Sequence, residues 1–170
     1  MSFEPLVQNA ITSISRAVVV NGKSGRVGTA LLMKDGSIIT GFNIESRGFP
    51  ILHAEIVAVI TAIKMGYSSN DYVALAIACN FPGDYPACAC CRQFLWEHTN
   101  PDLTIISYDL NAKEGKAYKL GELYPMPFPT VETFKKDDVQ SVEQVVNDDK
   151  QEENKGVASG VVKDEVSENV

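Results

Sequence analysis

The order of hydrophobic and polar residues predicts the elements of the chain, beginning with an amphipathic segment near the N-terminus. Residues 5–19 place apolar side chains at helical spacing, and Pro5 is tolerated in a first turn, so we predict a helix there. The residues that share its apolar face are Leu6, Ile11, Ile14 and Val18. Residues 21–25, Asn-Gly-Lys-Ser-Gly, then predict a loop.

Two strands joined by a tight turn follow this loop. Residues 27–33 and 37–43 read as strands, and the segment 34–36, Lys-Asp-Gly, is a hairpin turn signal between them. Gly28 and Ala30 are small, which indicates that another element packs closely against the first of these strands.

The middle of the chain is more strongly apolar. Residues 53–65 are apolar on nearly every helical face, which predicts a buried helix that stops at Gly66. Residues 72–79 are continuously apolar, as expected of a strand in the middle of a covered sheet. A loop over 80–86 then leads into a helix over 89–98.

The last elements complete the fold class. Residues 103–107 predict a strand, residues 111–115 a turn, and residues 119–124 a short helix. Hairpin, helix, strand, helix and strand in this order predict an α/β fold, a three-layer α/β/α sandwich with a mixed sheet.

The charge of the chain is unevenly distributed, and this divides it into two parts. Residues 131–170 hold eleven acidic residues and five lysines, a balance of −6, out of a total of −7. We therefore predict a folded domain over 1–130 and an acidic, disordered tail over 131–170, or alternatively a helix over 138–146 that docks on the body. The nearly neutral body lacks the basic stripe that nucleic-acid binding normally requires.

Cysteine usage and hydropathy indicate the compartment. Four cysteines, three of them clustered, argue against a disulfide framework and for reducing surroundings. No apolar run is long enough to span a bilayer, and the first residues lack the order of a signal peptide. We expect a soluble cytoplasmic protein with no membrane partner.

Two short motifs carry the candidate chemistry. His53 stands two residues before Glu55 at the start of the apolar helix, and Cys88 and Cys91 begin the next helix. Imidazole and thiolates are zinc ligands, and a catalytic zinc keeps its fourth position for water. Thiols at i and i+3 share one side of a helix start, where free amide groups favour anionic sulfur. Bound zinc lowers the pKa of that water to about 7, and Glu55 is placed to transfer its proton.

A closed structural zinc site or a redox pair is the main alternative for two cysteines at this spacing. A closed site needs a fourth ligand, and Cys90 is the nearest thiol. Cys90 projects about 100° away from Cys91 on a helix, so we expect it in the core. The carboxylate of Glu55, at the offset typical of zinc deaminases, favours a catalytic metal.

With these motifs the chain resembles the cytidine deaminase family, including its blasticidin-S deaminase relatives, over about residues 5–128. Further matches are residues 41–45, Gly-Phe-Asn-Ile-Glu, and residues 122–128, Glu-Leu-Tyr-Pro-Met-Pro-Phe. The resemblance implies a Zn²⁺ cofactor, a small nucleoside substrate and a homo-oligomer, a tetramer as the first expectation and a dimer as the second.

The resemblance also implies roles for four residues in substrate binding. Asn43 and Glu45 stand where the family binds the ribose hydroxyls, for which an amide and a carboxylate are suitable partners. Ala54 would offer a backbone group to the edge of the base, and Phe128 would close over the base, often from a neighbouring subunit.

Several departures from the family pattern leave the substrate open. Proline stands at position 86 instead of directly before Cys88, and Gly25 and Arg26 replace the aromatic residue that nucleoside-specific members carry before the strand. With Arg47, these residues leave room for a carboxylate or phosphate on the substrate. We therefore expect deamination of cytidine or deoxycytidine, alternatively of a modified nucleoside such as blasticidin S, and only remotely a structural zinc module or a polynucleotide editor.

Overall fold

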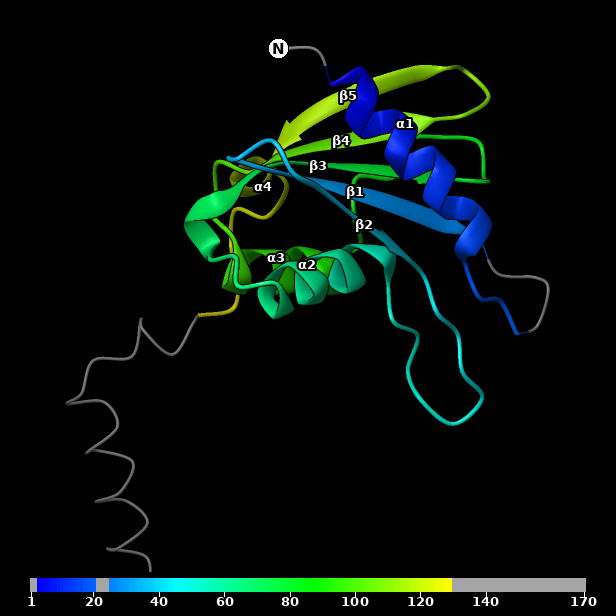
Figure 1. Cartoon of the computed structure of the whole chain (residues 1–170), viewed down its shortest axis with the longest axis horizontal. Coiled ribbons are helices and arrows are strands. Elements are labelled where there is room, and N and C mark those ends of the chain that lie inside the picture. Colours follow the sequence, from blue (N-terminus) through cyan, green and yellow to red (C-terminus); the bar gives the residue numbers. More distant parts are fainter. Residues whose placement is uncertain (1–2, 21–24, 130–170) are drawn as a thin grey trace, which may run out of the picture. The chain divides into compact units, whose positions relative to one another are not determined.

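A mixed five-stranded sheet forms the centre of the fold in the computed structural model, which describes residues 3–20 and 25–129 (Figure 1). Its order is β2-β1-β3-β4-β5, with β3 and β4 parallel and the other neighbours antiparallel. The strands are β1 (Val27–Met33), β2 (Ile38–Phe42), β3 (Tyr72–Cys79), β4 (Thr104–Asp109) and β5 (Glu114–Lys119). The tail expected over 131–170 and the alternative helix over 138–146 lie outside the described residues.

Helices cover both faces of this sheet. They are α1 (Glu4–Ser13), η1 (Ile14–Arg16), α2 (Ala54–Lys64), η2 (Ser69–Asp71), α3 (Ala89–His98) and α4 (Leu120–Leu123). Helix α1 lies on one face, whereas α2 and α3 lie side by side on the other, which confirms the three-layer sandwich (Figure 1). None of the helices in the described part of the chain is long and apolar enough to cross a membrane.

The continuously apolar β3 is explained by its two covered faces. Ala74 and Ala76 point into the core beneath α1, and Leu75 and Ile77, which alternate with them, point into the core beneath α2 and α3. Small side chains on the α1 side allow that helix to approach closely. A Cβ atom built on Gly28 would lie 2.2 Å from the carbonyl oxygen of Ala10 in α1, so the predicted close packing on β1 is confirmed.

The prediction of a first helix over residues 5–19 is wrong at its C-terminal end. Helix α1 ends at Ser13, one 3-10 turn follows, and Ala17 is extended. The backbone amide of Val18 instead donates to the carbonyl of Asn43 at 3.0 Å. The buried hydroxyl of Ser13 donates to the carbonyls of Ala10 and, at 3.0 Å, of Gly41, so it anchors the end of the helix on the sheet.

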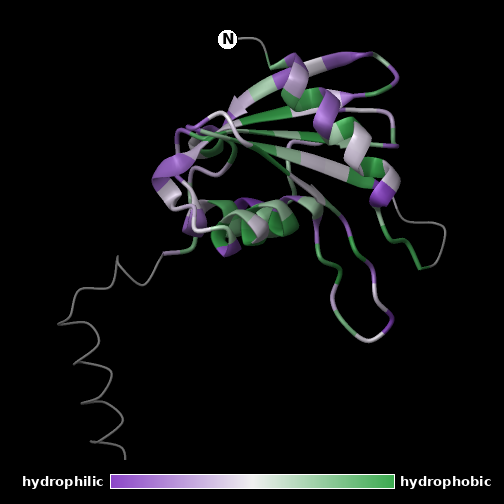
Figure 2. Ribbon diagram, in the orientation of Figure 1, coloured by the Kyte–Doolittle hydropathy of each residue, from purple (hydrophilic) through white to green (hydrophobic). Residues whose placement is uncertain are grey.

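The prediction that α2 is buried on all sides is also wrong. Its buried residues lie on one side, whereas Ile60 and Ile63 are 47% and 44% exposed. The helix belongs to an outer layer, so no part of the described chain covers the side that faces away from the sheet (Figure 2). An apolar surface therefore remains on α2.

Strand β5 was not expected from the sequence, which placed a turn and a helix start around it. Its residues 114–119 are Glu-Gly-Lys-Ala-Tyr-Lys, mostly exposed, and the strand pairs through its backbone with β4 at the edge of the sheet. A polar edge strand has no hydrophobic period to reveal it. The short helix predicted after it is confirmed as α4.

Candidate active site

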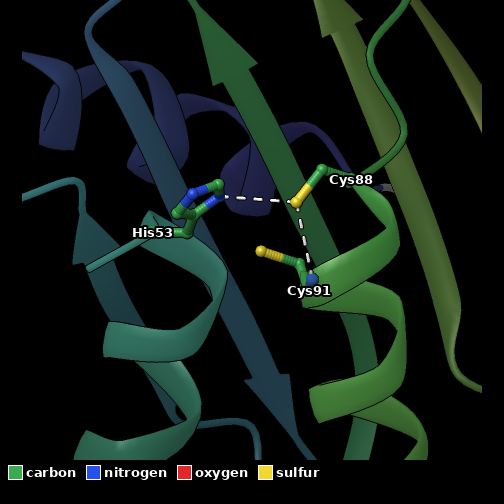
Figure 3. Close-up of side chains that lie close together, drawn as sticks. All are labelled: His53, Cys88 and Cys91. Carbon is green, nitrogen blue, oxygen red and sulfur yellow. Dashed lines mark hydrogen bonds between the residues drawn. The ribbon is translucent and has the colours of Figure 1, made fainter. Parts of the chain in front are cut away.

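The three predicted metal ligands meet because two helices begin next to each other. His53 is the residue before α2, and Cys88 is the residue before α3. The imidazole Nδ1 of His53 lies 3.5 Å from Cys88 Sγ, and Cys91 Sγ completes a group whose ligand atoms lie within 4.8 Å of one another (Figure 3). The structure thus brings together residues that stand 35 positions apart in the chain.

This donor set fits a tetrahedral zinc ion. Zinc bonds of about 2.0–2.1 Å to nitrogen and 2.3 Å to sulfur separate two such ligands by about 3.6 Å, close to the observed 3.5 Å. Burial raises the pKa of the Cys91 thiol, and the charges of Glu55 and Cys88 raise it further. Crowded anionic groups of this kind are stabilised by a bound cation.

Cys90 does not belong to this group. It is exposed, whereas Cys91 is fully buried in the core formed with α2, so the expectation that Cys90 lies in the core is wrong. Cys91 and Leu95, one turn apart, are the buried residues of α3, so they occupy the side of the helix that faces the sheet. Cys90 therefore lies on another side of the helix. Within the described residues, the metal group contains three side chains and leaves a fourth position for a small molecule.

Glu55 lies in the first turn of α2, beside the ligands. It is only 5% exposed, and burial raises the pKa of its carboxyl group. Its own backbone amide, the charge of His53 and a hydrogen bond with Cys91 act in the opposite direction. A buried carboxyl group whose charge depends on its neighbours is suited to accept and return a proton.

A cavity of about 580 Å³ opens on His53, Cys88 and Glu55, whereas Cys91 lies buried behind its wall. The expected substrate residues Asn43, Glu45 and Ala54 line it. The side chain of Asn43 accepts from the amide of Val27 at 2.8 Å and donates to the carbonyl of Gly25 at 2.9 Å, and Glu45 Oε2 accepts from the amide of Val20 at 2.8 Å. These bonds hold both side chains at the cavity wall.

A loop closed at its base places His53 near these residues. Ile44 and Leu52 exchange two backbone hydrogen bonds of 2.9 and 3.0 Å, and the residues between them extend away from the sheet (Figure 1). Because the chain returns to the end of β2 at Leu52, the next residue enters the site beside Asn43 and Glu45.

Phe128 is placed differently from the other expected substrate residues. It is 68% exposed and is not among the described residues that line the cavity of its own chain. Its amide donates to Gln93 Oε1 at 2.9 Å, and its carbonyl accepts from Gln93 Nε2 at 3.2 Å. Gln93 also accepts from the hydroxyl of Tyr124 at 2.8 Å, so this side chain tethers the segment before Pro129 to α3.

Arg92 is a positioning residue to which the sequence reasoning assigned no role. Its Nε donates to the carbonyl of Ala87 at 3.0 Å, and its Nη1 donates to that of Leu123 at 3.0 Å. Ala87 has a positive φ of 57°, a conformation that costs a non-glycine residue free energy, and it directly precedes Cys88. The signal in the sequence was the position of Arg92 directly after the second thiol.

The two other arginines considered from the sequence lie outside the cavity lining. The guanidinium of Arg26 donates to the carbonyl of Ala17, and Arg47 is exposed on the loop after β2. Neither side chain lines the cavity of its own chain.

Fold and site together define a zinc-dependent deaminase of the α/β class. A model of the cytidine and deoxycytidylate deaminase zinc-binding region matches residues 2–106. A cytidine deaminase from Halalkalibacterium halodurans is 33% identical over 130 residues, which are 75% of this chain and 95% of that protein. The chain belongs to the cytidine deaminase family.

Solved structures agree with this assignment. A cytidine deaminase from Burkholderia pseudomallei superimposes with a TM-score of 0.70 at 26% identity, covering 75% of this chain and 100% of that one. A cytidine deaminase from Mycobacterium tuberculosis gives a TM-score of 0.64 at 29% identity, with coverages of 76% and 99%.

Proposed function

We propose that this protein hydrolyses an aminopyrimidine nucleoside, cytidine or deoxycytidine, to uridine or deoxyuridine and ammonia. One observation carries the proposal: three candidate zinc ligands lie within 4.8 Å of one another, and two of them, His53 and Cys88, line a cavity of about 580 Å³ together with the buried Glu55. The relative and the solved structures named above are cytidine deaminases, which supports the same substrate class.

The roles of the residues follow from their chemistry. His53, Cys88 and Cys91 would hold zinc, which supplies an acidified water at neutral pH. Glu55 would accept one proton from this water and pass it to a ring nitrogen while the water oxygen bonds to the amine-bearing ring carbon. It would then take the second proton from that oxygen and deliver it to the amine, whose bond to the carbon breaks to release ammonia and leave the carbonyl of the product. Its burial keeps bulk water from competing for these protons.

The substrate contacts are part of this proposal. Asn43 uses one donor and one acceptor for backbone contacts, so its amide can still bond a sugar hydroxyl. Glu45 and Ala54 both line the same cavity, Glu45 with a carboxylate side chain and Ala54 at the start of α2. We propose that Asn43 and Glu45 bind the sugar hydroxyls and that Ala54 contacts the edge of the base.

We also propose that the protein is a homo-oligomer, a tetramer or alternatively a dimer. The exposed apolar side chains Ile60, Ile63 and Met65 form part of a surface that water solvates poorly. Phe128, exposed and outside its own cavity, would reach the cavity of a neighbouring copy and close over the base. Mass measurement in solution tests this assembly.

The uneven charge of the chain and its thiol ligands bear on the domain boundary and the compartment. We propose that residues 1–130 form the deaminase domain and that residues 131–170 form an acidic tail. Thiol ligands must stay reduced to bind zinc, which fits a cytoplasmic role in pyrimidine salvage.

Ammonia release by the zinc-loaded full-length chain tests the activity. The panel contains cytidine, deoxycytidine and blasticidin S, and we expect turnover of the first two. Faster turnover of blasticidin S would favour the alternative substrate. The absence of ammonia from every aminopyrimidine, in protein shown to contain one zinc per chain, would refute the proposed activity.

A further inference from the structure

Phe81 lies directly over the space that Gly25 leaves empty. A Cβ atom built on Gly25 would lie 2.0 Å from Cε2 and 2.7 Å from Cζ of the Phe81 ring. Both residues line the cavity that His53, Glu55 and Cys88 also line. The space before β1 is therefore closed by an aromatic side chain that follows β3, although the sequence suggested that it was open.

The backbone around this ring is fixed by the pairing of β1 with β3. Val27 stands opposite Cys79, and the pairing continues one residue further. There the amide of Arg26 donates to Asn80 Oδ1 at 2.7 Å, and the amide of Asn80 donates to the carbonyl of Arg26 at 3.1 Å. The connection at residues 79–81 therefore has little freedom to carry the ring away from Gly25.

The ring itself is 42% exposed, although its neighbours in the cavity wall include the apolar side chains of Val27 and Ile77. An aromatic face held at the wall of a cavity is covered favourably by a flat heteroaromatic ring. Because Gly25 has no side chain, the ring can lie against the backbone there, and any larger residue would displace it.

We infer that Phe81 is a substrate-binding residue whose ring stacks on the base of the aminopyrimidine nucleoside. The ring can take this position only because Gly25 has no side chain. This inference rests on the proposed function. It assigns the stacking on the base to Phe81, a residue outside every motif considered from the sequence. It predicts that residues 25 and 81 act as a coupled pair, although 56 positions separate them.

Steady-state kinetics of the full-length zinc-loaded protein test the role of the ring. We expect F81A and F81L to raise the KM for cytidine about tenfold or more, with a smaller change in kcat, because stacking on an aromatic ring is lost. F81L is the matched control for apolar bulk, and F81W should preserve the KM. An unchanged KM in both F81A and F81L would overturn the inference.

A double-mutant cycle tests the coupling to Gly25. G25A should raise the KM by displacing the Phe81 ring, yet it should have no further effect in the F81A background. Thermal unfolding of each variant confirms that the fold is retained. Independent effects of the two substitutions on KM would contradict the pairing.

Direct binding separates this inference from the proposed function. In an E55Q background, which removes the proton-transferring carboxylate, the fluorescence of F81W should be quenched by cytidine, whereas the protein with its single tryptophan, Trp96, should change little. Wild-type protein that neither binds nor deaminates an aminopyrimidine would overturn both proposals. Normal wild-type turnover with an unaffected KM in F81A and F81L would overturn only the role of Phe81.

Discussion

The hydroxyl of Thr29 donates a hydrogen bond of 2.9 Å to the carbonyl oxygen of Ala54, the residue between His53 and Glu55. Thr29 is fully buried in β1, and Gly41 in β2 approaches the same oxygen so closely that a Cβ atom there would lie 2.2 Å away. Two strands thus hold the first turn of α2, and with it the proposed metal ligand His53 and the proposed proton carrier Glu55.

Replacing Thr29 with Val should weaken this attachment while keeping the shape of the side chain. We expect a loss of about 1 kcal/mol in the free energy of unfolding, the typical contribution of one hydrogen bond, together with lower activity. Urea unfolding and ammonia release measure the two effects. Thr29→Ser retains the hydroxyl and should retain the activity better; equal activity loss in both variants would argue that the hydrogen bond is unimportant.

Glu55→Gln should separate metal binding from turnover. The amide keeps the size of the carboxyl group but cannot accept the proton, so we expect kcat to fall by about 100-fold or more, as general-base catalysis typically contributes 10²–10⁴-fold. Zinc content, measured by atomic emission, should stay near one per chain. Activity close to that of the wild type would exclude Glu55 as the proton carrier.

Cys88→Ser and Cys90→Ser form a matched pair of exposed thiol substitutions two positions apart. Of these two thiols, only Cys88 belongs to the candidate ligand group. Its loss should therefore reduce zinc affinity by more than the roughly 10–100-fold that is typical when a residue that only orients a ligand is lost. Zinc titration against a chelator measures this affinity. Cys90→Ser should bind zinc normally, and a comparable loss there would indicate a closed site with four protein ligands.

Arg92→Met should disturb the approach to Cys88 without removing a ligand. The variant keeps an apolar stem but loses the donors to the carbonyls of Ala87 and Leu123, which should cost about 1–3 kcal/mol of unfolding free energy. Zinc affinity should fall as well, because Arg92 holds Ala87, the residue directly before the candidate ligand Cys88. Arg92→Lys keeps the charge but not the forked donors, and we expect it to rescue little. Wild-type stability and zinc affinity in Arg92→Met would contradict the positioning role.

Much of the fold followed from local patterns. Three predictions depend only on residues close in sequence, and the structure confirms each of them. They are the hairpin turn at 34–36, the apolar strand at 72–79 and the helix that starts at Cys88. The edge strand β5 was missed because its pairing with β4 is a backbone contact that its polar side chains do not reveal. The exposed side of α2 was misjudged because periodicity cannot tell which face a neighbouring layer covers.

By itself, the sequence determined which chemistry to expect, since the identities and spacings of His53, Glu55, Cys88 and Cys91 already predict three zinc ligands and a proton carrier. Only the tertiary structure decided the contacts between distant segments. The position of the Phe81 ring over Gly25 and the hydrogen bonds of Arg92 arise from strand pairing and helix packing. The spacing of hydrophobic residues along the chain does not predict such contacts. Such contacts depend on where whole elements lie, which is set by the burial of many side chains at once.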